Sequence, residues 1–133
     1  MAHEQKFDPD DPVLARVRDL ALAMPSAREK VSHGRPAFFT RKVFAYYGGS
    51  RKVDGTWIQH PQSIMVQPDA RERAALLDDE RVWIPGYIGP SGWLAIDIGD
   101  ATDWDEVAEL LDMSYRMTAA ARLVDQLDEG DEQ

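Results

Sequence analysis

The chain contains no cysteine and no long hydrophobic run. Without thiols it has no disulfide, no zinc–thiolate site and no cysteine nucleophile, which fits a reducing compartment. No segment approaches the roughly 18 consecutive apolar residues that span a bilayer, and the first twelve residues lack the apolar stretch of a secretion signal. We therefore expect a cytoplasmic protein that does not associate with membranes.

Histidine is also scarce, and the residue patterns of common catalytic sites are missing. Only His33 and His60 lie beyond the N-terminal leader, and neither has a carboxylate or a serine at a diagnostic spacing. The sequence has no phosphate-binding loop, dinucleotide fingerprint or G-x-S-x-G motif. We therefore expect no catalytic residue, no cofactor and no metal.

The first amphipathic helix is predicted over residues 11–24. Pro12 fits the first helical turn, Pro25 ends the helix, and apolar residues recur between them at three- and four-residue spacing. Carboxylates near its start offer hard oxygen ligands for a divalent cation, which is a weaker alternative. Helix capping and the helix dipole already account for these residues, which are Asp8, Asp10, Asp11 and Asp19.

The middle of the chain reads as strands joined by short turns. The runs "EKVSHG", "PAFFT" and "KVFAYYGG" predict two consecutive hairpins, with a tight turn at 40–42 and a charged loop "GGSRKVDGT". A further strand is predicted at 63–67, followed by a short helix at 69–77 with Asp69 as its N-cap. The segments "RVWI" and "GWLAIDI" also read as strands, and the last helix is predicted from Asp103 to at least Leu123.

These elements define an α+β class. A chain of 133 residues is one domain in size. Because short loops join the strands, we predict a two-layer sandwich, with a mainly antiparallel sheet of about five strands and the N-terminal and C-terminal helices packed on it. Residues 1–10 are predicted as a flexible leader, 11–125 as the domain, and 126–133 as a disordered acidic tail.

The charge is distributed unevenly. The net charge is −9, yet residues 28–52 contain seven basic side chains and one acidic one. Four of the basic residues lie at the two predicted hairpin tips, and Arg35 lies close by. Neutralising about four phosphates gives a salt slope near −3.6, enough for weak binding with little sequence preference. The tip residues are Arg41, Lys42, Arg51 and Lys52.

Residues 81–97, "RVWIPGYIGPSGWLAID", combine aromatic residues with proline and glycine. One interpretation is structural: Trp83 and Trp93 flank a turn and pack on the helices. The other is functional: the turn holds Trp83, Tyr87 and Trp93 at the mouth of a pocket for a small ligand or a protein partner. The residue pattern leaves both open.

The order of "FFTRKVFAYYGG" at 38–49, "SIMVQPD" at 63–69, "IPGYIGPSGWLAID" at 84–97 and "LLDMSYRM" at 110–117 resembles the MmcQ/YjbR family of small bacterial proteins. The resemblance implies a CyaY-like fold, DNA binding through a double-wing arrangement of hairpins, and no catalytic residues. We therefore expect double-stranded DNA as the partner, contacted through the basic tips and Arg35. The aromatic loop at 83–93 remains the alternative site.

Overall fold

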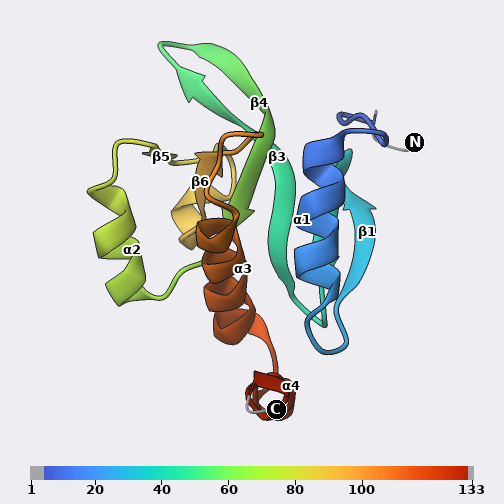
Figure 1. The fold of residues 1–133 in the computed structure, drawn as a ribbon. Helices are drawn as coiled ribbons and strands as arrows, with labels where there is room; N and C mark the ends of the chain where they lie inside the picture. The colour runs from blue at the N-terminus through green and yellow to red at the C-terminus, as the bar shows by residue number, and fades with distance from the viewer. Residues whose placement is uncertain (1–4, 132–133) are drawn as a thin grey trace.

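The computed structural model describes residues 5–131, and Figure 1 shows its path. The elements are α1 (Pro12–Leu22), β1 (Arg28–Ser32), β2 (Arg35–Phe39), β3 (Val43–Val53), β4 (Thr56–Val66), α2 (Ala70–Leu77), β5 (Val82–Trp83), the 3-10 turn η1 (Gly89–Ser91), β6 (Leu94–Asp97), α3 (Trp104–Thr118) and α4 (Ala121–Asp131). Within the described part of the chain, no helix has the length and apolar character needed to cross a membrane.

All neighbouring strands of the sheet are antiparallel. Six strands pair in the order β1-β2-β3-β4-β6-β5, and α1 and α3 lie side by side on one face (Figure 1). This arrangement confirms the α+β class and the helical layer, with six strands where about five were expected. The short helix predicted at 69–77 is also confirmed, because Asp69 accepts a hydrogen bond from the Glu72 backbone N–H at 2.8 Å.

The hairpin of β3 and β4 is longer than the sequence indicated. Its strands pair as far as Val53 and Thr56, and Asp54 and Gly55 form a two-residue turn with φ of 50° and 81°. An Asp-Gly pair suits this turn because both central residues need positive φ. The expected charged loop is therefore mostly strand, and the hairpin projects beyond the rest of the molecule (Figure 1).

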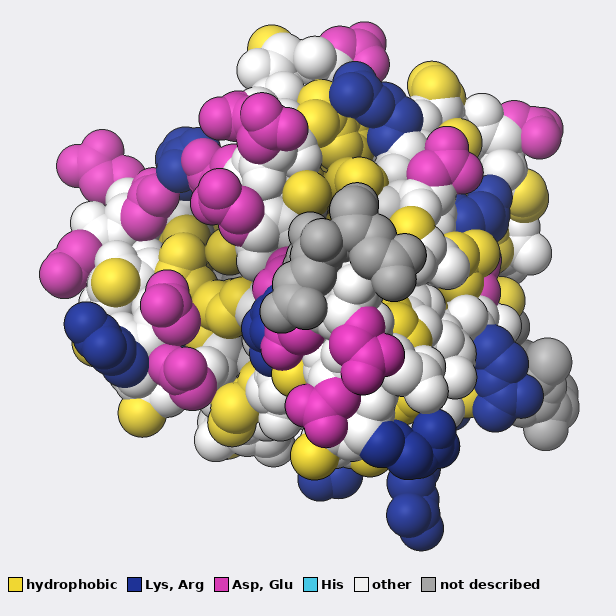
Figure 2. Space-filling view, turned by 60° about the horizontal axis from the view of Figure 1, so that its bottom comes forward, with side chains coloured by type: hydrophobic (Ala, Val, Ile, Leu, Met, Phe, Trp, Pro, Cys, Tyr) yellow, Lys and Arg dark blue, Asp and Glu magenta, His cyan; other side chains and the backbone are white. Residues whose placement is uncertain are grey.

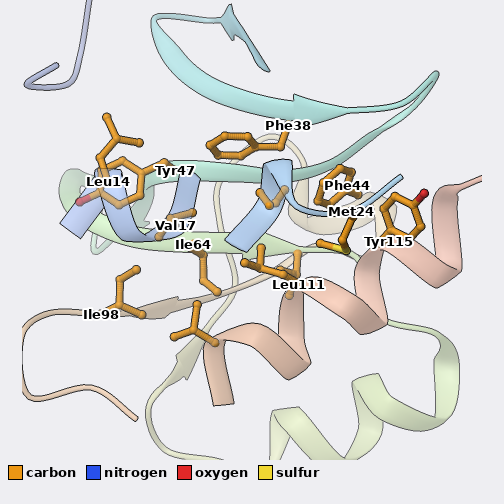
Figure 3. Close-up of a cluster of buried hydrophobic side chains, with 14 of the residues drawn as sticks. Leu14, Val17, Met24, Phe38, Phe44, Tyr47, Ile64, Ile98, Leu111 and Tyr115 are labelled. Atoms are coloured by element: carbon orange, nitrogen blue, oxygen red, sulfur yellow. The ribbon is translucent and has the colours of Figure 1, made fainter. Parts of the chain in front are cut away.

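The core lies between the sheet and the helices, as Figure 3 shows. Side chains of α1 and α3 meet residues of β2, β3 and β4 that point to the same face, because every second residue of a strand does so. Its largest fully buried side chains include Leu14, Phe38, Phe44, Tyr47, Ile64, Leu111 and Tyr115.

Asp11 connects α1 to the sheet. It is the N-cap of α1, and its Oδ1 accepts hydrogen bonds from the Val13 N–H at 2.9 Å and from the Gln62 amide at 3.2 Å. Its other oxygen accepts a short hydrogen bond from the buried Tyr47 hydroxyl. Burial, followed by this bond, raises the pKa of Tyr47. The aspartate predicted as a capping residue therefore also fixes the helix on β3 and β4.

Ser114 and Tyr115 fix α3 in the same way. The fully buried Ser114 hydroxyl donates to the Phe44 carbonyl and accepts from the Gln67 backbone N–H at 2.8 Å. The Tyr115 hydroxyl donates to the Pro25 carbonyl at 2.7 Å, after α1. The Ser-Tyr pair that contributes to the family resemblance is therefore part of the architecture.

The two ends of the chain correct the predicted boundaries. The last helix is interrupted at Ala119, whose ψ of 155° is extended, and α4 continues to residue 131. Leu127 of α4 packs on the core, so the acidic tail is helical as far as it is described, and residues 132–133 lie outside the described part. Of the leader, residues 1–4 also lie outside it, but the Lys6 N–H donates to the Gly34 carbonyl at 2.8 Å and Phe7 packs on the core.

Replacing Ser114 with alanine tests the attachment of α3. The change leaves the Gln67 N–H and the Phe44 carbonyl without this partner, and a buried polar group left unsatisfied costs about 1–3 kcal/mol. We expect Ser114→Ala to lower the free energy of unfolding in urea by that amount. Ser91→Ala, at an exposed position, is the control. A loss no greater than that of the control would contradict this role.

Candidate ligand site on the second face of the sheet

The second face of the sheet, opposite α1 and α3, is covered by the loop of residues 84–93. Beneath this loop, Met65, Trp83, Trp93 and Ala95 form a second buried cluster. Tyr46 packs on the cluster, with its ring 5.3 Å from that of Trp93. Both tryptophans are buried, as the structural interpretation expected, but they pack on the face away from α1 and α3.

Close contacts hold the loop against the projecting hairpin. The Gly86 N–H donates to the Ser50 carbonyl at 2.9 Å. A Cβ on Gly86 would lie 2.4 Å from the Trp57 ring, so only glycine fits there without displacing that ring. The next residue, Tyr87, stacks on Trp57 with ring centroids 5.0 Å apart and is 86% exposed. Tyr87 therefore lies at the surface, where it also borders the cavity described next.

Between this loop and the turn joining β1 and β2 lies a cavity of about 450 Å³. Its volume is within the range of small-molecule sites. Tyr46, Met65 and Ile88 provide apolar walls, and Ser32 and Ser50 provide hydroxyl groups. We call this space the Arg35 cavity, because the Arg35 side chain from β2 also lines it.

Arg35 is the most unusual residue of the cavity. It is 8% exposed, and its Nη2 donates to the Gln59 side-chain oxygen at 2.7 Å. No carboxylate among residues 5–130 forms an ion pair with it. Burial lowers its pKa, although arginine stays charged at neutral pH. Its guanidinium fits beside Gly48 because a Cβ there would lie 2.6 Å from Nη1.

Two residues that line the cavity have unusual backbone conformations. His33 has φ of 54° and Tyr87 has φ of 61°, a region that residues other than glycine adopt infrequently. His33 adopts it because it forms, with Gly34, the two-residue turn between β1 and β2, whereas Tyr87 adopts it in the loop. Lys6 completes the lining, and no acidic residue of the described chain takes part in it.

The predicted basic tips do not form one surface. Arg41 and Lys42 lie in the turn between β2 and β3, whereas Arg51 and Lys52 lie near the far end of β3. Consecutive hairpins share a strand, so their turns are at opposite ends of it, about 30 Å apart for ten residues. Arg35 is buried between them. On the face in Figure 2, basic side chains form separate groups among many acidic ones.

Arg51 takes part in a polar network on the second face. Its Nε donates to His60 Nε2 at 3.2 Å, and His60 Nδ1 lies 2.8 Å from Asp97 Oδ1. The His60 ring stacks on Trp83, whose indole N–H donates to Asp97 at 3.2 Å. Histidine therefore does have a carboxylate partner, but it lies 37 residues away in the sequence, where no local spacing reveals it. Both ring nitrogens of His60 therefore have hydrogen-bond partners in the described structure.

The fold and the site define a small α+β domain with a ligand-sized cavity on the sheet face that lacks helices. The profile of the YjbR family matches residues 22–117, and the chain belongs to that family. The matched region includes every residue that lines the Arg35 cavity except Lys6. A search of curated proteins gives no significant match.

Replacing Arg35 with methionine tests whether the buried charge lowers the free energy of unfolding. Methionine has a similar length and needs no counter-charge, and apolar replacement of buried charges is often stabilising by about 1–4 kcal/mol. We expect Arg35→Met to raise the free energy of unfolding by about 1 kcal/mol or more in urea. Arg41→Met, at an exposed position, should change it by less than about 0.5 kcal/mol. A clear loss of stability in Arg35→Met would show that the guanidinium serves the fold.

Proposed function

We propose that this protein is a non-catalytic module that binds a small ligand in the Arg35 cavity. The observation that carries the proposal is the cavity itself, about 450 Å³ of space with apolar walls next to a buried polar group. Small-molecule sites typically combine these features. The loop of residues 84–93 forms one wall and is fixed at Ser50 and Trp57, so the site is largely preformed.

Binding without catalysis fits the chemistry of the described residues. A nucleophile needs a base within hydrogen-bond reach, and the base needs an orienting group. The histidine with a carboxylate partner, His60, is not part of the cavity lining. The cavity hydroxyls of Ser32 and Ser50 therefore serve as hydrogen-bonding groups in this proposal.

A cavity-blocking variant tests the proposal. We expect a library of small fragments to contain binders that shift the methyl signal of Met65 in NMR spectra of the folded protein. Ser50→Phe places a ring in the cavity and should weaken these binders by about tenfold or more, a loss of about 1.4 kcal/mol. Ser91→Phe, outside the cavity, should leave them unchanged. The absence of any fragment that shifts Met65, or equal binding to both variants, would refute the proposal.

DNA binding is the second candidate, and one feature favours it. Four exposed basic residues lie toward the same end of the sheet, where Arg28 pairs with Phe39 next to the β2–β3 turn. Arg28 and Lys30 both lie over the Phe39 ring, at 5.1 and 4.7 Å from its centroid, which orders them. These two residues together with Arg41 and Lys42 constitute the basic end, a smaller surface than the expected pair of tips.

Fluorescence anisotropy with labelled duplex DNA at about 50 and 200 mM salt separates the two candidates. If the basic end binds DNA through about four phosphates, affinity falls with a salt slope near −3.6. It should disappear in the double variant Arg41→Ala and Lys42→Ala and persist in Arg51→Ala with Lys52→Ala and in Ser50→Phe. No binding at the lower salt concentration would exclude the DNA candidate and leave the ligand site unaffected.

A further inference from the structure

We infer that the Arg35 cavity takes a small organic anion, an inference that rests on the proposed ligand site. The carboxylate or phosphate group of this ligand binds the Arg35 guanidinium, and a flat apolar group packs against Tyr46, Met65 and Ile88. The ligand is thus specified by an oxyanion and a planar apolar group that fits within the cavity.

The buried Arg35 guanidinium has donors to spare and a charge that no carboxylate of the described chain offsets. A guanidinium has five N–H donors, and Arg35 uses Nη2 to bind the neutral Gln59 side chain. Burying a charge without a counter-charge is unfavourable, and within the described chain no carboxylate offsets it. An oxyanion in the cavity supplies both the missing charge and acceptors in the planar geometry that a guanidinium matches.

The charge of the cavity lining differs in sign from the net charge of the chain. The chain has a net charge of −9, yet the described lining contains Lys6 and Arg35 and no acidic side chain. The cavity is therefore a basic site on an acidic protein. The acidic surface of the rest of the protein repels anions, so the cavity, where Arg35 supplies fixed donors, is the favoured place for an anion to bind.

The size and the walls indicate an organic anion. A bare phosphate or chloride ion would leave most of the 450 Å³ empty and the apolar walls in contact with water. The Tyr46 ring is held in place by Trp93, at a centroid distance of 5.3 Å, so it offers a fixed surface. The Met65 thioether adapts to flat rings and makes favourable contacts with them.

Three probes with one ring system test the inference by isothermal titration calorimetry: 2-naphthoate, 2-naphthyl phosphate and the neutral 2-naphthamide. We expect one of the two anions to bind the wild-type protein at least about tenfold more tightly than the amide, because a hydrogen bond to a charged group is stronger than one to a neutral group. The preferred anion distinguishes a carboxylate ligand from a phosphate ester. Arg35→Met should reduce the preference over the amide to less than about threefold, whereas Arg41→Met should preserve it.

A second variant keeps the test valid if Arg35→Met does not fold. Ser50→Glu places a carboxylate in the same cavity, where it can pair with Arg35 in place of the ligand. We expect it to raise the melting temperature and to abolish binding of the anions. Unchanged anion binding in Ser50→Glu would overturn the inference.

The outcomes separate this inference from the proposed function. If the amide binds as tightly as the anions, or if neutral fragments shift Met65 while both anions fail to bind, the anion inference is wrong and the ligand site stands. If no compound of either kind shifts Met65, both are wrong.

Discussion

Two helices, α1 and α3, cover one face of the sheet. The other face carries Met65, Ala95 and two tryptophans, and exposing these apolar side chains to water is unfavourable. A ten-residue loop covers them. The loop contains three glycines, and its Ile84 and Tyr87 side chains are exposed rather than packed on the sheet, so it covers the face without filling all the space above it. Its attachment through Gly86 to Ser50 leaves a hollow at the edge toward β1 and β2. The candidate site is a consequence of this unequal coverage.

The position of Arg35 makes the hollow chemically specific. Its side chain reaches the cavity beside Gly48, where β3 has an irregular register and no side chain occupies the space. The fold gains no ion pair from this residue in the described chain, while Asp11, Ser114 and Tyr115 perform identifiable structural work. A buried group that makes no evident contribution to the stability of the fold is expected at a functional site. For this reason we assign the function to the second face of the sheet, where Arg35 lies.

Much of the fold could be predicted from the sequence because local signals specify it. The spacing of apolar residues and the flanking prolines indicated α1, and the cap at Asp69 indicated α2. The interruption at Ala119 could not be predicted, because alanine favours a helix and tertiary packing of Leu123 and Leu127 decides the change of direction.

The candidate site was predicted only in part, because it depends on contacts between distant residues. The aromatic stretch at 83–93 contributes Tyr87 to the lining of the cavity, but Trp83 and Trp93 are buried and do not line it. Strand alternation does not reveal that Arg35 is buried, since this depends on Gly48 and on a loop fifty residues later. The two basic hairpin tips were expected to form one surface, but both hairpins contain β3 and their turns lie at its opposite ends.

The most direct measurement follows the arginine Nε–H signals of ¹⁵N-labelled protein during titration with whichever of 2-naphthoate and 2-naphthyl phosphate binds more tightly, with the signal of Arg35 assigned from its loss in Arg35→Met. The account predicts that the Arg35 signal shifts and saturates together with the Met65 methyl signal, while the signals of Arg41 and Arg28 stay in place. A Met65 shift without any change at Arg35, or a shift confined to Arg28 and Arg41, would contradict the account, because the ligand would then bind without the buried guanidinium.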